Sequence, residues 1–317
     1  MKGLTDVPGI RVGHASDYEA LTGCTVILCG PGALGGVDVR GSATGSCELE
    51  TLDPGHVATS VDAILLAGGS AFGLEAASGV RRILERQGIG FQTGVARVPI
   101  VPGAILFDLG IGRADVRPGL AMGEKAVLAA TDAAVAEGNV GAGTGATVGK
   151  ILGMRQAMKG GIGSASLTLG NGVVVAALVA VNAFGDVIDP ATGKVVAGAR
   201  KSPESREFIG SATALRHGVP EGRPFRGNTT LAVVATNAAL DKVQVNKLAA
   251  MASLGMGRSI SPVNTMSDGD ITFAIARGSG KASVNAVGTA AAEVLAEAVL
   301  RAVRAAKTAG GVPGLAG

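Results

Sequence analysis

The chain has 317 residues, which is enough to bury a sizeable core within one large domain. Hydrophobic residues make up 47% of it and aromatic residues only 3%, so the core must be built from Ala, Val, Leu and Ile. The net charge of +3 comes from scattered Lys and Arg, with no basic stripe interleaved with aromatics, which argues against nucleic acid as a partner and favours a small molecule.

Membranes and cofactors are also not expected. No apolar run reaches the roughly 18 residues that a spanning helix needs, and the N-terminal segment lacks the apolar core of a signal peptide. We therefore expect a soluble, cytoplasmic protein. Cys24, Cys29 and Cys47 have no metal-ligand spacing and are expected to be reduced residues in or near the core, so we predict neither a metal nor another cofactor.

Strand-like and helix-like runs alternate along the chain without an internal repeat and without the strict βαβ rhythm of a Rossmann sheet, which favours a mixed α/β class. The expected elements, in chain order, are strand 22–28, a glycine-rich loop 30–45, strand 58–66, helix 71–87, helix 123–137, strands 167–169 and 173–181, strand 229–236, helix 241–256, strand 270–276 and helix 284–307. Gly170-Asn171-Gly172 predicts a hairpin turn, because Gly and Asn tolerate positive φ. In the last helix, Glu297 and Arg301 are spaced to form an ion pair.

The stretch from 199 to 227 is rich in charges, prolines and glycines and is interpreted as an exposed, partly helical connector. A β-branched run begins directly after it at Thr229. If the bond before Thr229 were cut, the new α-amine could act as the general base for the threonine hydroxyl, since its unperturbed pKa is about 7.7–8.0. The alternative is that Asn228-Thr229 merely opens a strand.

Several segments, in this order, resemble the DmpA-type aminopeptidase family, which includes the nylon-oligomer hydrolases. They are Val37-Asp38-Val39-Arg40-Gly41, residues 66–76, Gly141-Ala142-Gly143-Thr144 leading to Gly149-Lys150, Ala180-Val181-Asn182, Gly227-Asn228-Thr229-Thr230, Asp268-Gly269-Asp270 and residues 283–286. The resemblance spans nearly the whole chain. It implies one domain over 1–317 with a four-layer αββα sandwich similar to that of N-terminal-nucleophile hydrolases, autocatalytic cleavage before a Ser or Thr, and a homo-oligomer of four or more copies.

Matched position by position, Thr229 takes the place of the nucleophile. The scissile bond then lies between Asn228 and Thr229, and cleavage leaves subunits 1–228 and 229–317. Lys150 matches the lysine near the nucleophile, where a fixed cation would lower the pKa of the neighbouring ammonium. Otherwise Lys150 is a solvated loop lysine.

Three further polar residues are carried over in the same way. Asn182 matches the asparagine of the oxyanion hole, a neutral donor for the charge that develops on the acyl oxygen; alternatively, it is a turn residue at the end of a strand. Asp268 and Asp270 match the acidic pair of the nylon-hydrolase branch, where they could orient Thr229 or a substrate ammonium. Their alternative is a solvated turn before a strand.

Residues beside these are given supporting roles. Thr230 is expected to support the nucleophile from the other face of its strand. Phe107 stands where relatives carry Tyr, so a hydroxyl that could bind the oxyanion or the substrate is missing. Gly143 and Thr144 lie in a glycine-rich segment that could bring backbone amides to the site or to a substrate. This segment is not a P-loop, because Thr144 replaces the required glycine and Ile151 follows the lysine.

The predicted protein is a self-processing N-terminal threonine amidohydrolase or aminopeptidase. It would release N-terminal amino acids from small peptides, amides or ω-amino-acid oligomers through an acyl-enzyme on Thr229. Two alternatives stay open: an acyltransferase similar to ornithine acetyltransferase, and an uncleaved, non-catalytic binding or scaffold protein.

Overall fold

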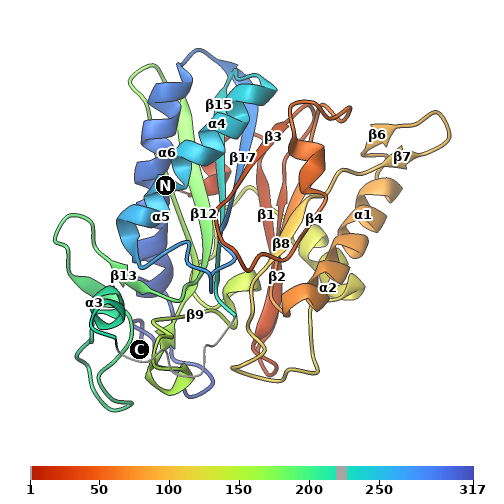
Figure 1. Ribbon diagram of the computed structural model, residues 1–317. Helices are drawn as coiled ribbons and strands as arrows, with labels where there is room; N and C mark the ends of the chain where they lie inside the picture. The colour runs from red at the N-terminus through yellow and green to blue at the C-terminus, as the bar shows by residue number, and fades with distance from the viewer. Residues whose placement is uncertain (1, 219–226) are drawn as a thin grey trace.

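The computed structural model describes residues 2–218 and 227–317. Two five-stranded sheets pack face to face, and helices cover the outer face of each, so the four-layer αββα prediction is confirmed (Figure 1). Buried apolar residues fill three contiguous layers, one between the sheets and one beneath each set of helices. No helix in the described part of the chain combines the length and apolarity that crossing a membrane requires.

The first sheet has the strand order β1-β2-β5-β8-β4. Because β2 and β5 are buried on both faces, their sequences are nearly continuous apolar runs. Its strands are β1 (Arg11–Asp17), β2 (Thr22–Leu28), β4 (Ser46–Cys47), β5 (Ala63–Ala67) and β8 (Gly103–Ile105), and its outer face is covered by α1 (Ala76–Arg86) and α2 (Leu120–Leu128).

The second sheet has the order β11-β12-β15-β17-β3. β15 and β17 are parallel and the other pairs antiparallel, so the chain must cross over between β15 and β17, which it does through two helices. The strands are β3 (Leu34–Val39), β11 (Gly161–Thr168), β12 (Val174–Asn182), β15 (Thr229–Ala238) and β17 (Ile271–Gly280); the helices are α4 (Lys242–Ala252), α5 (Leu254–Ser259) and α6 (Val284–Arg304).

Strand β15 shows how the sequence pattern builds these layers. Leu231 and Val233 contribute to the core between the sheets, whereas Ala232 and Val234 contribute to the core beneath the helices. This alternation follows from the two-residue period of a strand. Small residues let α6 pack closely on the sheet: a Cβ at Gly163 would lie 2.0 Å from the Ala298 carbonyl oxygen.

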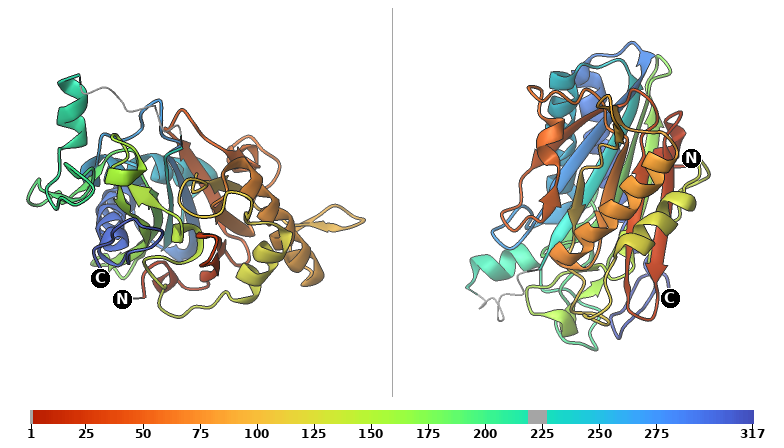
Figure 2. Two further views of the ribbon diagram at one scale, coloured as in Figure 1. Left: turned by 90° about the horizontal axis from the view of Figure 1, so that it is seen from below. Right: turned by 90° about the vertical axis from the view of Figure 1, so that its right-hand side faces the viewer.

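Short elements lie at the ends of the sheets. The hairpin of β6 and β7 projects away from the body of the molecule (Figure 2). These elements are η1 (Leu4–Asp6), η2 (Leu49–Leu52), η3 (Ser70–Glu75), β6 (Phe91–Gln92), β7 (Arg97–Val98), η4 (Gly141–Gly143), β9 (Thr147–Val148), η5 (Met154–Gln156), β10 (Met158–Lys159), β13 (Asp186–Ile188), β14 (Val195–Ala197), α3 (Ser211–Arg216) and β16 (Ile260–Ser261).

The predicted glycine-rich loop 30–45 is wrong in part, because it contains β3, the edge strand of the second sheet. Glycine is unfavourable in a strand, but here it is required by packing. A Cβ at Gly36 would lie 2.6 Å from backbone atoms of Val245 and Asn246 in α4.

The predicted helix 123–137 is also shorter than expected and ends at Leu128. Thr131 instead exchanges two backbone hydrogen bonds with Val12, which extends the edge of the first sheet. Glu137 lies beyond this point and forms the ion pair with Arg301 through two hydrogen bonds of 2.8 and 2.7 Å. The partner of Arg301 is therefore Glu137 rather than Glu297.

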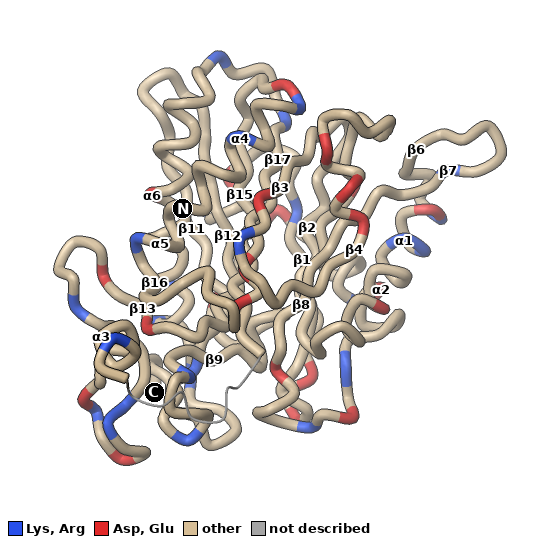
Figure 3. Tube along the Cα trace, in the orientation of Figure 1, with Lys and Arg blue, Asp and Glu red and all other residues tan. Residues whose placement is uncertain are grey.

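Other boundaries differ less. The hairpin around Gly172, whose φ is +82°, is confirmed as the β11–β12 connection. The predicted helix 71–87 starts with the 3-10 turn η3, and the helix 241–256 is interrupted at Ser253 into α4 and α5. Within the connector 199–227, α3 confirms the partly helical prediction, and Pro220, Glu221, Arg223 and Pro224 lie outside the described residues. Segments of Lys and Arg and segments of Asp and Glu are scattered over the described trace (Figure 3).

Candidate active site

The residues matched to the catalytic positions meet at one end of the second sheet. Thr229, the first residue of β15, is paired in register with Asn182, the last residue of β12. On the other side of Thr229, Asn228 forms an isolated parallel bridge with Asp268, just before β17. Segments far apart in sequence are thus brought to one point by the adjacent central strands β12, β15 and β17.

The peptide bond between Asn228 and Thr229 lies at the centre of this arrangement. The Thr229 hydroxyl donates to the Asn228 carbonyl oxygen at 2.5 Å. The same oxygen accepts the backbone N–H of Gly269 at 2.8 Å. The hydroxyl therefore lies beside the carbonyl that it would attack, and an N–H donor already points at the oxygen on which negative charge would develop.

The Asn182 side chain bonds to the carbonyl of Gly227, the residue before Asn228, and not to the Asn228 carbonyl itself. Its Nδ2 donates to the carbonyl oxygens of Phe107 at 3.1 Å and Gly227 at 3.4 Å. Its Oδ1 accepts from the Thr147 N–H at 3.0 Å and from Lys150 Nζ at 2.8 Å. The Asn228 carbonyl, the candidate for cleavage, thus accepts the Gly269 N–H, and Asn182 Nδ2 faces the carbonyl of Gly227.

Lys150 is buried, not a solvated loop lysine. Its Nζ donates to the Asn182 carbonyl oxygen at 2.9 Å as well as to Oδ1. Burial lowers the pKa of Lys150 to about 7, against the opposing effects of Asp268 and Asp270. This lowered pKa makes the neutral amine of Lys150 accessible near neutral pH, whereas the sequence suggested a fixed cation at this position.

The two aspartates are also buried, which excludes a solvated turn. Asp268 accepts from the Phe184 N–H at 3.2 Å and from the Thr265 hydroxyl at 2.6 Å. Asp270 accepts the Thr230 N–H at 2.6 Å, directly beside the candidate nucleophile. Burial and the nearby Asp268 charge raise the pKa of Asp270 well above its usual range.

The supporting residues fall into two groups. Phe107 and Thr230 lie at the site: the Phe107 ring packs so closely on Gly227 that a Cβ there would be 2.6 Å from it. Gly143 and Thr144 serve the fold around the site. A Cβ at Gly143 would lie 2.4 Å from the Ile162 nitrogen, and the Thr144 hydroxyl is bonded to the Gly141 carbonyl at 2.7 Å.

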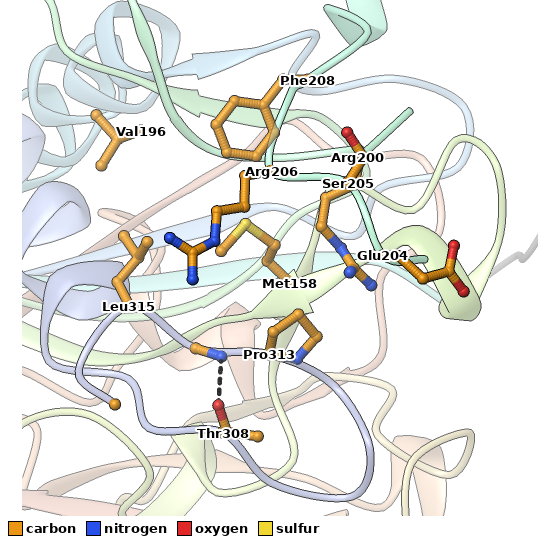
Figure 4. Close-up of a pocket in the computed structure, with 12 residues that line it drawn as sticks. Met158, Val196, Arg200, Glu204, Ser205, Arg206, Phe208, Thr308, Pro313 and Leu315 are labelled. Atoms are coloured by element: carbon orange, nitrogen blue, oxygen red, sulfur yellow. Dashed lines mark hydrogen bonds between the residues drawn. The ribbon is translucent and has the colours of Figure 1, made fainter. Parts of the chain in front are cut away.

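In this uncut form the site is closed. The side chains matched to catalytic positions are all between 0% and 3% exposed, so a substrate would not reach them. A cavity of about 690 Å³ opens elsewhere, beside β10, and includes none of them (Figure 4). It is lined by Met158, Val196, Arg200, Glu204, Ser205, Arg206, Phe208, Thr308, Pro313, Gly314, Leu315 and Gly317.

Some residues of this region were not found from the sequence. The Gly269 N–H and the Thr147 N–H are backbone donors, which no residue type reveals. Lys159 is a second buried lysine, and its sequence context does not differ from that of a surface lysine. Across residues 2–218 and 227–317, no group of three or more His, Cys, Asp or Glu side chains could hold a metal ion.

Comparisons with known proteins identify the family of this chain. The sequence profile of "Peptidase family S58" matches residues 2–316. An uncharacterized aminopeptidase of Mycobacterium tuberculosis is 42% identical over 99% of this chain and 96% of its own length. A 6-aminohexanoate-oligomer endohydrolase of an Agromyces species is 35% identical over 94% of this chain and 84% of its own.

Two solved structures share the fold. A β-aminopeptidase of a Burkholderia species has a TM-score of 0.71 and 26% identity over 99% of this chain and 90% of its own. The L-aminopeptidase D-Ala-esterase/amidase of Ochrobactrum anthropi, described as a variant of the Ntn hydrolase fold, has a TM-score of 0.72 over 96% and 86% of the two chains, at 21% identity. On the strength of this match over nearly its whole length, the chain belongs to peptidase family S58, the DmpA family, and is a hydrolase of peptide or amide bonds.

Proposed function

We propose that this enzyme activates itself by cleaving the bond before Thr229 and then uses Thr229 as an N-terminal nucleophile. The observation that carries the proposal is the 2.5 Å contact between the Thr229 hydroxyl and the Asn228 carbonyl oxygen, with the Gly269 N–H on the same oxygen. A threonine that merely opened a strand would not require this pair of contacts.

The cleavage step follows from these contacts. Thr229 Oγ1 attacks the Asn228 carbonyl carbon and gives up its proton to a base. The C–N bond then breaks, the Thr229 nitrogen takes up a proton as it leaves, and Asn228 is held as an ester on Oγ1. Water hydrolyses this ester, which leaves a carboxylate on Asn228 and a free α-amine on Thr229.

Before cleavage the α-amine is still part of a peptide bond, so another base is needed. Lys150 is suited to this role, because burial lowers its pKa to about 7 and a neutral fraction is present at neutral pH. Its Nζ is hydrogen-bonded to Asn182, which pairs with Thr229 in the sheet. The proposed base for self-cleavage is therefore neutral Lys150.

After cleavage the α-amine of Thr229 takes over as the base. The new chain end at 227–228 can then leave, which frees Asn182 Nδ2 from the Gly227 carbonyl and opens a closed site. We propose that Asn182 binds the oxyanion during turnover, whereas the Gly269 N–H does so during self-cleavage. Asp268 and Asp270 hold the loop beside Thr229 in both stages.

The substrates are proposed from the relatives. Their names include aminopeptidase, β-aminopeptidase and 6-aminohexanoate-oligomer endohydrolase. We propose that this enzyme releases N-terminal amino acids from small peptides, amides or ω-amino-acid oligomers through an acyl-enzyme on Thr229. The homo-oligomer and the cytoplasmic location stay predictions.

Replacing Thr229 tests this function. Thr229→Ala should yield one uncut chain without amidase activity, whereas Thr229→Ser, which keeps the hydroxyl, should still be cut. Intact mass spectrometry and hydrolysis of amino-acid amides and 6-aminohexanoate oligomers give the two readouts. Thr289→Ala on the exposed face of α6 is the matched control and should be cut normally. Undiminished amidase activity in uncut Thr229→Ala would refute the proposal.

A further inference from the structure

A second lysine is buried close to the site, and the proposed reaction does not use it. Lys159 in β10 is 0% exposed. Its Nζ donates to the carbonyl oxygens of Thr144 at 3.0 Å and Ala146 at 2.7 Å. Burying an ammonium is costly in free energy unless it is paired and hydrogen-bonded. A fully buried lysine at this position therefore needs a structural or functional explanation.

The two carbonyls bonded to Lys159 lead directly into the active site. They belong to the turn before β9, and Thr147, the first residue of β9, is paired with Lys159 across the β9–β10 ladder. The Thr147 N–H donates to Asn182 Oδ1 at 3.0 Å, and Lys150 Nζ donates to the same oxygen at 2.8 Å. Lys159 thus bonds to the turn that leads into Thr147, one of the two residues that donate to Asn182 Oδ1.

An electrostatic interaction also links Lys159 to Lys150. Burial lowers the pKa of Lys159 to about 7, and the Asp108 carboxylate, which accepts from the Thr22 hydroxyl and the Gly69 N–H, both at 2.7 Å, opposes that shift. The charged groups that act on Lys150 are Asp268, Lys159, Asp270 and Asp108. Burial is the main cause that opposes protonation of Lys150, and among these four charged groups Lys159 is the one that acts in the same direction.

We propose that Lys159 is a positioning residue for self-cleavage: through the 144–147 turn it orients the Asn182 amide and, with it, the Lys150 amine. This inference rests on the proposed function, in which neutral Lys150 is the base. Lys159 does not touch the reacting atoms, so it acts only through these two neighbours.

The direction of the pH effect follows from the charges. The Lys159 ammonium lowers the pKa of Lys150, so removing that charge should raise the pKa. The Lys150 amine would then lose its proton only at higher pH. Lys159→Met should therefore shift the rise of the self-cleavage rate to higher pH, and Lys159→Arg, which keeps a cation that can bond to the two carbonyls, should restore it at least in part.

A matched control separates this effect from a loss of stability. Arg200 is also a buried cation held by backbone carbonyls, among them those of Arg155 and Ala157 beside β10, but it faces the cavity of Figure 4 and not Asn182. Arg200→Met should lower stability without moving the pH profile. A profile for Lys159→Met that coincides with that of Arg200→Met would overturn the inference.

A second measurement does not depend on cleavage. In the Thr229→Ala chain, NMR of labelled lysine side chains, with Lys150 assigned from a Lys150→Met spectrum, follows the titration of Lys150 directly. A move to higher pH on adding Lys159→Met supports the inference even if Thr229 is not the nucleophile; an unchanged titration overturns it. Failure of the proposed function would appear separately, as cleavage of the Thr229→Ala chain.

Discussion

At the residue scale, the site depends on a glycine that neither reacts nor binds through a side chain. A Cβ at Gly269 would lie 2.7 Å from Thr229 Oγ1 and 2.6 Å from the Ala43 carbonyl oxygen. We expect Gly269→Ala to displace the hydroxyl or the Gly269 N–H and to slow self-cleavage by about 10²–10³-fold, the usual cost of losing one oxyanion donor. A time course of intact masses measures this rate.

The control for this variant is another glycine-to-alanine change. A Cβ at Gly257 in α5 meets nothing within 4 Å, so Gly257→Ala should be cut at the normal rate. It should also gain up to about 1 kcal/mol of stability, because alanine is the better helix former. Equal cleavage rates for the two variants would show that the Gly269 contacts do not matter.

At the scale of elements, the edge strand β3 is held by its closeness to α4. Gly36→Ala would place a Cβ 2.6 Å from the α4 backbone, and the Val37 N–H also donates to the Asn246 side chain of α4 at 3.0 Å. We expect the variant to lose roughly 1–3 kcal/mol in free energy of unfolding, as for other overpacked sites. Urea unfolding of the chain that also carries Thr229→Ala measures this without interference from cleavage.

The control for Gly36→Ala is another glycine-to-alanine substitution, Gly170→Ala, at the tip of a hairpin. Gly170 lies between β11 and β12, and a Cβ there meets nothing within 4 Å. Gly170→Ala should therefore leave the urea midpoint nearly unchanged. A similar midpoint for Gly36→Ala would mean that α4 and β3 can separate at little cost.

At the scale of the whole molecule, the position of the proposed cut would determine whether the two subunits stay together. β15 and β17, both after the cut, lie between β12 and β3, both before it. Cleavage would therefore leave two chains that share one hydrogen-bonded sheet. We expect the subunits to stay together on native size-exclusion chromatography and to separate only in denaturant; elution of a free 229–317 subunit without denaturant would contradict this.

The sequence by itself determined those features that depend on local patterns or on motif order. The alternation in β15 and the Gly-rich hairpin between β11 and β12 predicted strands and a turn. The order of the motifs identified the family, and with it Thr229, Lys150, Asn182 and the two aspartates as candidates. These residues are distant in sequence, so their spacing does not predict that they meet at one end of the second sheet. Only the resemblance to the family grouped them in one site.

Only the tertiary structure decided how these residues are paired. Gly36 lies in a strand that pairs with β17 and leaves room for α4, and the chain after α2 bonds to β1 through Thr131 instead of continuing as a helix. The Gly269 N–H, not Asn182, donates to the Asn228 carbonyl, and Lys159 is buried close to the candidate site. Each of these outcomes depends on contacts between segments far apart in the chain or on the burial of a side chain. Burial alone can shift the pKa of a lysine. The local sequence encodes neither the long-range contacts nor the degree of burial.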